Sequence, residues 1–350
     1  MNTHHTLPLQ AEPASPARRL LRLRQQLGQL RGSSYDIANT CNLTCEGCLY
    51  FAKPAADRIT VEADTARWDR LFQSEAARGI NFAYLAGAEP STVPARLALA
   101  AKHIPQGVIF TNGTKRISRD INYRVHISMW GLGKTNAALR GADVNRKALR
   151  NYSDDPRALF TFTISAMNLD QIVEAAQLCH NHGVNITYSY YSATLQYNRM
   201  MADPKPAQDP YFRLGQPGTD PRHAQQTLTI AREHIAEAMA RYPETVVYSL
   251  QYNDWISQPI DQIYKFDADG VALNCGNRLK DGFEHITSDA ERSTGKCCSP
   301  NIDCRDCRAY AMGWASYFNR YSEFKSDPDS LQGWIEGLRT WASMFLPKDG

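Results

Sequence analysis

Residues 35–48 read Tyr-Asp-Ile-Ala-Asn-Thr-Cys-Asn-Leu-Thr-Cys-Glu-Gly-Cys, a short β-like run followed by a C-x3-C-x2-C loop. The loop carries Cys41, Cys45 and Cys48. Three thiolates on one short loop can bind three irons of a [4Fe–4S] cube and leave the fourth iron without a protein ligand. An open coordination position is typical of catalytic metal sites, whereas structural sites are closed. The alternative is a structural zinc ion with a distant fourth ligand, although zinc ligands usually come as two spaced pairs.

The chain around this loop alternates between short β-like runs and segments of helical periodicity. Predicted strands cover residues 35–38, 81–86, 107–111, 123–129, 159–165 and 185–191, and predicted helices cover residues 64–78, 93–103 and 169–182. Such repetition predicts parallel strands joined by right-handed crossovers, in either a doubly wound sheet or a barrel. Six strands are too few for a complete eight-stranded barrel.

Taken in this order, the strand, the cysteine loop and the α/β repeat resemble the radical S-adenosylmethionine (radical SAM) superfamily over residues 35–192. The resemblance implies an α/β fold built as a partial (β/α)6 TIM-like barrel of parallel strands. Gly87-Ala88-Glu89-Pro90 is similar to the family's Gly-Gly-Glu-Pro segment, which holds the methionine amine of SAM, with alanine in place of the second glycine. By the same resemblance, SAM contacts are expected at Gly87, Ala88, Glu89, Pro90, Thr111, Asn112, Ser128 and Asn168.

One position departs from the family's pattern. The family often has an aromatic or bulky apolar residue just before the third cysteine, where it touches the adenine, and this chain has Gly47 there. Tyr50 or Phe51 is the expected substitute. The resemblance also implies that the adenine packs at the end of the sixth predicted strand, near residues 188–192.

The resemblance implies a particular chemistry for the loop. Cys41, Cys45 and Cys48 would bind a [4Fe–4S] cluster whose open iron chelates SAM. One electron from the cluster would cleave the sulfonium to methionine and a 5′-deoxyadenosyl radical, which abstracts hydrogen from an unactivated carbon. A one-electron reductant such as flavodoxin or ferredoxin is the expected partner. The protein's share is placement, a dry cavity and tuning of the cluster potential.

A second group of cysteines lies nearer the C-terminus. It resembles the auxiliary-cluster domains called SPASM and twitch, in which a cysteine after a hairpin joins a downstream cysteine cluster, and the Asp269-Gly270 pair predicts the hairpin. A full SPASM domain needs seven cysteines, so a single twitch-like auxiliary [4Fe–4S] cluster is expected, with structural zinc as the alternative. The expected ligands are Cys275, Cys298, Cys304 and Cys307, with Cys297 as the alternate to Cys298.

The predicted domain organisation has three parts. Residues 1–34 form an Arg-rich helical extension, interpreted as a surface helix with an organelle transit peptide as the alternative. Residues 35–243 form the radical SAM core and end in a predicted helix over residues 222–241. Residues 244–350 form a small cysteine-rich α+β domain, with β runs at residues 246–250 and 271–273 and a final helix over residues 331–346.

The composition argues against several classes of protein. Of 350 residues, 43% are hydrophobic and 21% are charged, and no stretch approaches the roughly 18 consecutive apolar residues of a membrane span. The net charge of +3 is too small to argue for nucleic acid. We therefore expect neither a membrane nor a nucleic-acid partner. Nine clustered cysteines and an oxygen-sensitive cluster favour a reducing, cytoplasmic location.

The leading interpretation is a radical SAM oxidoreductase that acts on a small biosynthetic metabolite, by net oxidation or rearrangement. A radical SAM enzyme that modifies a peptide is the main alternative. A non-catalytic iron–sulfur or zinc scaffold is the alternative from another class. The segment before the core is expected to be too short for a cobalamin-binding domain or a module that recognises a peptide leader.

Overall fold

The computed structural model describes residues 23, 25, 27–51, 65–202, 209–215, 218–279, 282–293 and 302–347. The chain divides into two compact units, Met1–Leu30 and Arg31–Gly350. In the first unit, residues 23, 25, 27 and 28 are helical. The sheet, its covering helices and all candidate site residues belong to the second unit.

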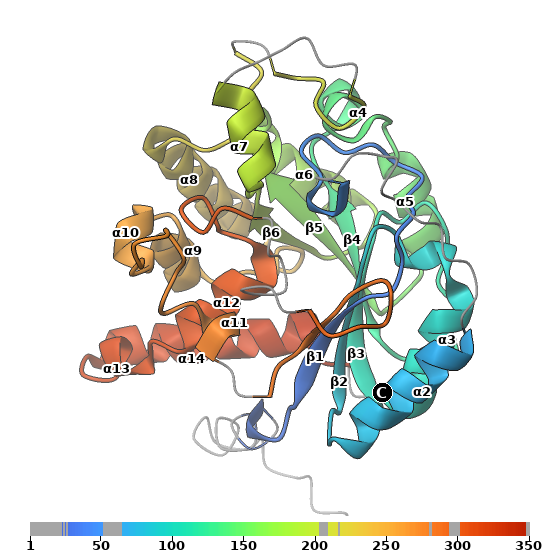
Figure 1. Ribbon diagram of the computed structural model, residues 1–350. Coiled ribbons are helices and arrows are strands. Elements are labelled where there is room, and N and C mark those ends of the chain that lie inside the picture. The colour runs from blue at the N-terminus through green and yellow to red at the C-terminus, as the bar shows by residue number, and fades with distance from the viewer. Residues whose placement is uncertain are drawn as a thin grey trace, which may run out of the picture. The chain divides into compact units, whose positions relative to one another are not determined.

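The described part of the second unit contains a sheet of seven parallel strands (Figure 1). β1 to β6 lie side by side in chain order, and β7 pairs with the free edge of β1. Strands in chain order keep their right-handed crossovers on one face, whereas a doubly wound sheet reverses at a switch point. The predicted partial (β/α)6 arrangement is therefore confirmed. The strands are β1 (Gly32–Asp36), β2 (Phe82–Ala86), β3 (Gln106–Thr111), β4 (Arg124–Met129), β5 (Ala158–Ile164), β6 (Ile186–Tyr190) and β7 (His285–Ile286).

Helices follow the strands, and α2 and α3 pack against each other beside the sheet (Figure 1). A second group, α9 and α11 to α14, packs together near the end of the chain. No helix in the described ranges is both long and apolar enough to cross a bilayer. The helices are η1 (Leu49–Phe51), α2 (Thr65–Ala77), η3 (Pro90–Thr92), α3 (Pro94–His103), α4 (Gly133–Arg140), α5 (Asn145–Tyr152), η4 (Leu169–Gln171), α6 (Ile172–Asn181), α7 (Leu195–Ala202), α8 (Gln225–Arg241), α9 (Leu250–Ile256), α10 (Ile260–Ile263), α11 (Gly276–Leu279), α12 (Tyr310–Phe318), α13 (Tyr321–Phe324) and α14 (Pro328–Phe345).

The first strand differs from its prediction. β1 begins at Gly32 and ends at Asp36, so residues 37 and 38 fall outside it. Glycine and serine have little β propensity, which hides the start of this strand in the sequence. Gly32, Ser33 and Ser34 nevertheless belong to the sheet, because β1 pairs with β2 in parallel and Gly32 lies opposite Phe82.

The helices predicted at residues 222–241 and 331–346 each begin three residues away from the predicted start. The predicted helix over residues 222–241 begins at Gln225 instead, because the Asp220 carboxylate accepts hydrogen bonds from the main chain and side chain of Arg222 and forms a local turn. The final helix begins at Pro328 rather than at residue 331. There the Asp327 carboxylate caps it by accepting the Ser330 N–H at 2.8 Å.

The C-terminal part is mainly helical, and the β runs predicted at residues 246–250 and 271–273 do not form strands. Val246 makes only an isolated bridge with Ile186, and α9 begins at Leu250, at the end of the predicted β run. The predicted hairpin is present in reduced form, since Phe266 and Ala272 make an antiparallel bridge around Gly270. β7 was not predicted, because a two-residue strand leaves no periodic pattern.

Candidate active site

The cysteine loop follows the carboxyl end of β1. Hydrogen bonds from its own main chain and from the Asn112 side chain fix its conformation. The Leu43 N–H donates to Cys41 Sγ at 3.4 Å, and the Asn112 side chain donates to the same sulfur at 3.8 Å. The Cys48 N–H donates to the Cys45 carbonyl at 3.2 Å and closes a turn. Hydrogen bonds to ligand sulfur are one of the means by which a protein tunes an iron–sulfur cluster.

Two thiols of the loop, those of Cys41 and Cys48, are buried enough to resist ionisation. Burial raises the pKa of Cys41 to about 11, and burial together with the neighbouring Cys45 raises the pKa of Cys48 further. Thiols that resist ionisation on their own become thiolates when a cation binds them. As the side chains stand, no three His, Cys, Asp or Glu residues within the described ranges converge on a single ion. The case for a cluster therefore rests on the spacing and surroundings of the thiols.

The Gly87–Pro90 segment runs directly against the end of β1. Gly87 has a φ of +117°, and a Cβ there would lie 2.8 Å from both the nitrogen and the oxygen of Ala38. Only glycine meets both requirements. The Ala88 N–H donates to the Ala38 carbonyl at 2.9 Å, and Ala88 has no positive φ. Alanine therefore fits where the family has its second glycine.

Glu89 is buried and joins this segment to the end of β3. Its Oε1 accepts the Thr111 hydroxyl at 2.6 Å and the Ser91 N–H at 3.0 Å. Its Oε2 accepts the Asn112 N–H at 2.7 Å. The predicted contact of Glu89 with the amine of SAM stays a prediction.

Asn112 is the point at which three sequence motifs meet. Its main chain binds Glu89, and its side-chain Nδ2 donates to Asn42 Oδ1 at 2.8 Å and to Cys41 Sγ. The Asn42 side chain in turn donates to Thr114 Oγ1 at 2.8 Å. The cysteine loop, the Gly87–Pro90 segment and the Thr111–Thr114 turn thus form one hydrogen-bonded unit. Asn42 was not predicted, although its place directly after Cys41 was the available signal.

Asn168 and Ser128 lie at the ends of β5 and β4. The Asn168 amide donates to the carbonyls of Trp130 and Thr163 at 3.1 and 3.0 Å and accepts the Ser165 N–H at 2.8 Å. Both ends of this amide therefore bind main chain and tie the two strand ends together. Ser128 is partly exposed. Contacts of either residue with SAM stay predictions.

Arg140 is a site residue that the sequence did not reveal. Its guanidinium is buried at the end of α4, donates to the Ser128 carbonyl, and leaves Nε without a partner among the described residues. Its charge also acts on the Cys41 thiol, whose pKa it lowers against the larger effect of burial. A buried cation beside the cysteine loop complements an anionic group of a ligand. Nothing in the sequence separates Arg140 from the other arginines.

Gly47 is required by the packing around it. Its φ is +60°, and a Cβ would lie 2.1 Å from Tyr191 Oη and 2.8 Å from Tyr197 Cδ2. These tyrosines fill the space that a larger residue before the third cysteine would need. The Phe51 ring lies 4.7 Å from the ring of Tyr211, and which side chain covers an adenine stays a prediction.

On the inner face of the sheet, each strand from β1 to β6 has one partly exposed residue among its last two, and the chain neighbours of each such residue are buried. The strand register places all six on the same face. Solvent therefore reaches this face near the carboxyl ends of the strands, where parallel barrels place their substrates. We call these residues the inner ring; they are Asp36, Ala86, Phe110, Ser128, Thr163 and Ser189.

Asp36 is the charged member of the inner ring, and a histidine lies beside it. His285, from β7, places Nε2 at 3.2 Å from Asp36 Oδ2. Its Nδ1 is buried and has no partner among the described residues. Sequence reasoning missed this pair because the two residues are far apart in the chain and β7 was not predicted.

Two of the described auxiliary cysteines, Cys275 and Cys307, lie near Tyr264. Burial, and next the thiols of Cys307 and Cys275, raise the pKa of Tyr264. Cys275 also accepts a hydrogen bond from Ser316 Oγ at 3.9 Å, and Cys307 N–H donates to the Cys304 carbonyl at 3.4 Å. Cys275 and Cys307 thus share Tyr264 as a neighbour. The ligand set stays a prediction, since Cys297 and Cys298 lie outside the described residues.

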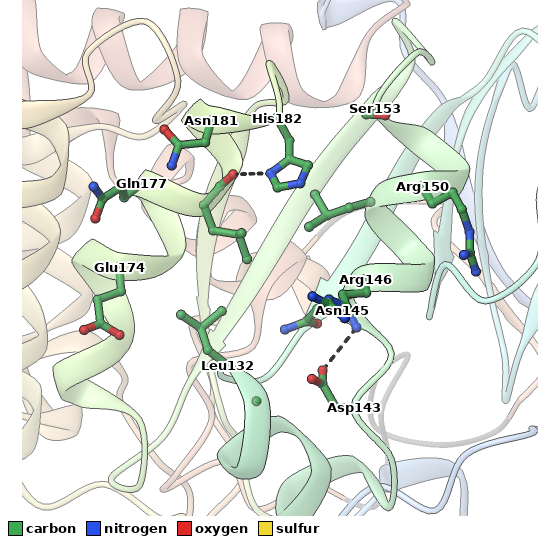
Figure 2. A pocket seen from close by; sticks show the side chains of 13 residues that line it. Leu132, Asp143, Asn145, Arg146, Arg150, Ser153, Glu174, Gln177, Asn181 and His182 are labelled. Carbon is green, nitrogen blue, oxygen red and sulfur yellow. Dashed lines mark hydrogen bonds between the residues drawn. The ribbon is translucent and has the colours of Figure 1, made fainter.

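A separate hollow lies between α5 and α6, away from these motifs (Figure 2). None of the predicted site residues lines it. His182 at its edge donates from Nδ1 to the Leu178 carbonyl at 2.9 Å, which caps its own helix. The lining residues labelled in the figure are Leu132, Asp143, Asn145, Arg146, Arg150, Ser153, Glu174, Gln177, Asn181 and His182.

No protein-family model matches this sequence, and the comparison with curated proteins found no match. Among solved structures, the chain is similar to Streptococcus suis SuiB bound to S-adenosylmethionine, with 14% identity and a TM-score of 0.42. The match covers 64% of this chain and 49% of SuiB, so this chain spans about half the length of SuiB. It is similar to native anSMEcpe with bound AdoMet at 13% identity and a TM-score of 0.49, over 79% of both chains. HydG, a maturase of the [FeFe]-hydrogenase, matches at 10% identity and a TM-score of 0.40, over 65% of this chain and 54% of HydG. Similarities at this level assign neither a family nor an activity.

Proposed function

We propose that this protein is a radical SAM enzyme that cleaves S-adenosylmethionine reductively and abstracts hydrogen from a small metabolite. The observation that carries the proposal is the junction at Asn112. It joins the C-x3-C-x2-C loop to the Gly87–Pro90 segment through hydrogen bonds to Cys41 and Glu89. An electron-transfer scaffold needs the cysteines but has no use for a second motif attached to them at the carboxyl edge of a parallel sheet.

The residues of the chain have separate parts in this proposal. Cys41, Cys45 and Cys48 would hold a [4Fe–4S] cluster, which when reduced supplies one electron to the sulfonium of SAM and so releases the 5′-deoxyadenosyl radical. Asn112 orients Cys41 through its sulfur contact. Arg140 presents a buried positive charge next to the loop, where it complements the carboxylate of SAM.

The inner ring supports a substrate site on the same edge of the sheet. Its hydroxyl groups and the Asp36–His285 pair offer hydrogen bonds to a polar metabolite, and Phe110 offers an apolar surface. A substrate held there lies at the carboxyl ends of the strands, as the cysteine loop does. In the proposed setting, flavodoxin or ferredoxin would supply the electron in a reducing cytoplasm. Cys275, Cys304 and Cys307, with Cys298 or Cys297, would hold a twitch-like cluster, which would supply an electron acceptor for a net oxidation.

The test uses protein reconstituted anaerobically with iron and sulfide. After dithionite and SAM are added, the wild-type chain should form 5′-deoxyadenosine. Replacing Cys41, Cys45 and Cys48 together with alanine should abolish its formation and remove about four irons per chain. Cys179→Ala is the matched control, because Cys179 is buried on α6 and belongs to neither cysteine group. Bound zinc in place of iron, with SAM left intact, would contradict the proposal and favour a zinc scaffold.

A further inference from the structure

Glu46 is a fully buried acid inside the cysteine loop, and the proposed chemistry has not used it. Its Oε1 accepts the Tyr197 hydroxyl at 3.0 Å and the Leu214 N–H at 3.1 Å. Its Oε2 accepts the Arg213 N–H at 2.8 Å. A buried carboxylate is retained where its oxygens find such donors, because desolvation otherwise costs more than the fold can supply.

The segment that supplies these donors, residues 209–215, also binds the loop in the opposite direction. The Tyr211 carbonyl accepts the Gly47 N–H at 2.8 Å, and the Tyr211 ring packs against Phe51 just beyond the third cysteine. Arg213 extends along the loop and donates to Thr44 Oγ1 at 3.1 Å and to the Ala138 carbonyl at 2.8 Å. The loop and the segment therefore hold each other on both sides of Glu46.

We propose that Glu46 is a positioning residue for the cysteine loop. Its carboxylate fastens residues 209–215 against the stretch from Cys45 to Cys48. In the chain, Glu46 directly follows Cys45 and precedes Cys48 by two residues. Among the described residues, the donors to Glu46 are a phenol and two main-chain amides, and these neutral groups orient the charge without cancelling it. Negative charge near an iron–sulfur cluster stabilises the oxidised form and lowers the reduction potential.

The first arm of the test needs no cluster. Trypsin cleaves the bond between Arg213 and Leu214. Glu46 accepts hydrogen bonds from the N–H groups of both residues. Glu46→Ala should raise the rate of this cleavage in the apo protein by about tenfold, because local opening becomes easier when bonds to a charged acceptor are lost. Glu75→Ala is the matched control: Glu75 is also fully buried and accepts hydrogen bonds from Tyr35 and Arg78, but on α2. Cleavage at the wild-type rate in Glu46→Ala would overturn the fastening role.

The second arm rests on the proposed function, since it measures the reduction potential of the cluster at the loop. Glu46→Gln removes the charge and should raise this potential. Tyr197→Phe keeps the charge, removes one hydrogen bond and should leave the potential close to that of the wild type. If Glu46→Gln and the wild type have equal reduction potentials, Glu46 does not influence the cluster. The proposed function would not be affected by that result. If the wild-type chain binds no iron, both the proposed function and the effect of Glu46 on the reduction potential are contradicted. The trypsin experiment would still test whether Glu46 fastens residues 209–215 to the loop.

Discussion

His126 Nε2, on β4, donates a hydrogen bond of 2.8 Å to the main-chain oxygen of Met344, 218 residues later in α14. The same oxygen accepts Arg124 Nε at 3.1 Å. A carbonyl can only accept, so the bond requires a proton on Nε2 of His126. The ring is buried between the aromatic side chains of Phe110, Tyr310 and Phe345, and its Nδ1 has no partner among the described residues. The C-terminal helix is thus attached to the sheet through the His126 imidazole.

The first prediction concerns stability in acid. Burial, with a smaller contribution from the Arg124 charge, lowers the pKa of His126 to about 3, and burial lowers that of His223 to about 4. Between these values and the ordinary histidine pKa of about 6.5, only the unfolded chain takes up protons. The free energy of unfolding should therefore fall as the pH drops below 6.5, by about 1.4 kcal/mol per pH unit for each histidine.

Urea unfolding at pH 7.5, 6 and 5 measures this slope. His126→Gln cannot titrate and keeps a donor for the Met344 carbonyl, so its slope should be shallower than that of the wild type by about one proton. His182→Gln is the control, because His182 is exposed. Equal slopes in His126→Gln and the wild type would show that His126 is protonated in the folded chain.

The second prediction concerns Glu89. Glu89→Ala removes the acceptor for the Thr111 hydroxyl and for the N–H groups of Ser91 and Asn112, and should lower the free energy of unfolding by about 3 kcal/mol. Glu89→Gln keeps the shape and one acceptor oxygen, and should cost about half as much. Urea unfolding without SAM measures both. Glu174→Ala, at an exposed position of α6, should change little. If Glu89→Ala unfolds like the wild type, the hydrogen bonds around Asn112 do not hold the site together.

The core of the fold was predictable because its strands carry a local signal. β3 and β4 combine β-branched and aromatic residues with turn residues at their ends, and both were predicted to within one residue of their bounds. The parallel arrangement follows from strand–helix repetition alone. β1 and β7 carried too little local signal, since one begins with glycine and serine and the other has two residues.

The candidate site was predictable in its motifs but not in its contacts. Spacing identified the cysteine loop, because the signal lies within eight residues. The partners of Glu46 lie on α7 and on residues 209–215, and the partner of Asp36 lies on β7. Such pairs depend on how distant elements pack, and the sequence alone contains no periodic trace of them. At Asn168, the sequence suggested a contact with a ligand. In the described structure, both ends of its amide bind main-chain groups instead.

The third prediction concerns Gly47. Gly47→Ala places a Cβ against Tyr191 Oη and forces alanine to a positive φ, which should cost about 1–3 kcal/mol of stability and lower the iron content after reconstitution. Tyr191→Phe alone should be close to neutral, because that hydroxyl has no hydrogen-bond partner among the described residues. The double variant should recover part of the loss, since the backbone strain and the contact with Tyr197 remain. Thermal unfolding measures all three, and a fully stable Gly47→Ala would contradict this account of the glycine.

The fourth prediction separates the two groups of cysteines. If Cys275, Cys304 and Cys307 help to hold a second [4Fe–4S] cluster, the reconstituted wild type should contain about eight irons, and the variant with all three replaced by alanine should contain about four. All three are replaced together because three thiolates can still hold a cube and a serine oxygen can stand in for a thiolate. The irons that remain should be those at Cys41, Cys45 and Cys48, which the variant keeps. If the auxiliary site holds zinc instead, the wild type should contain about four irons and one zinc, and the triple variant should lose the zinc alone. An unchanged metal content in the triple variant would show that these thiols bind no metal.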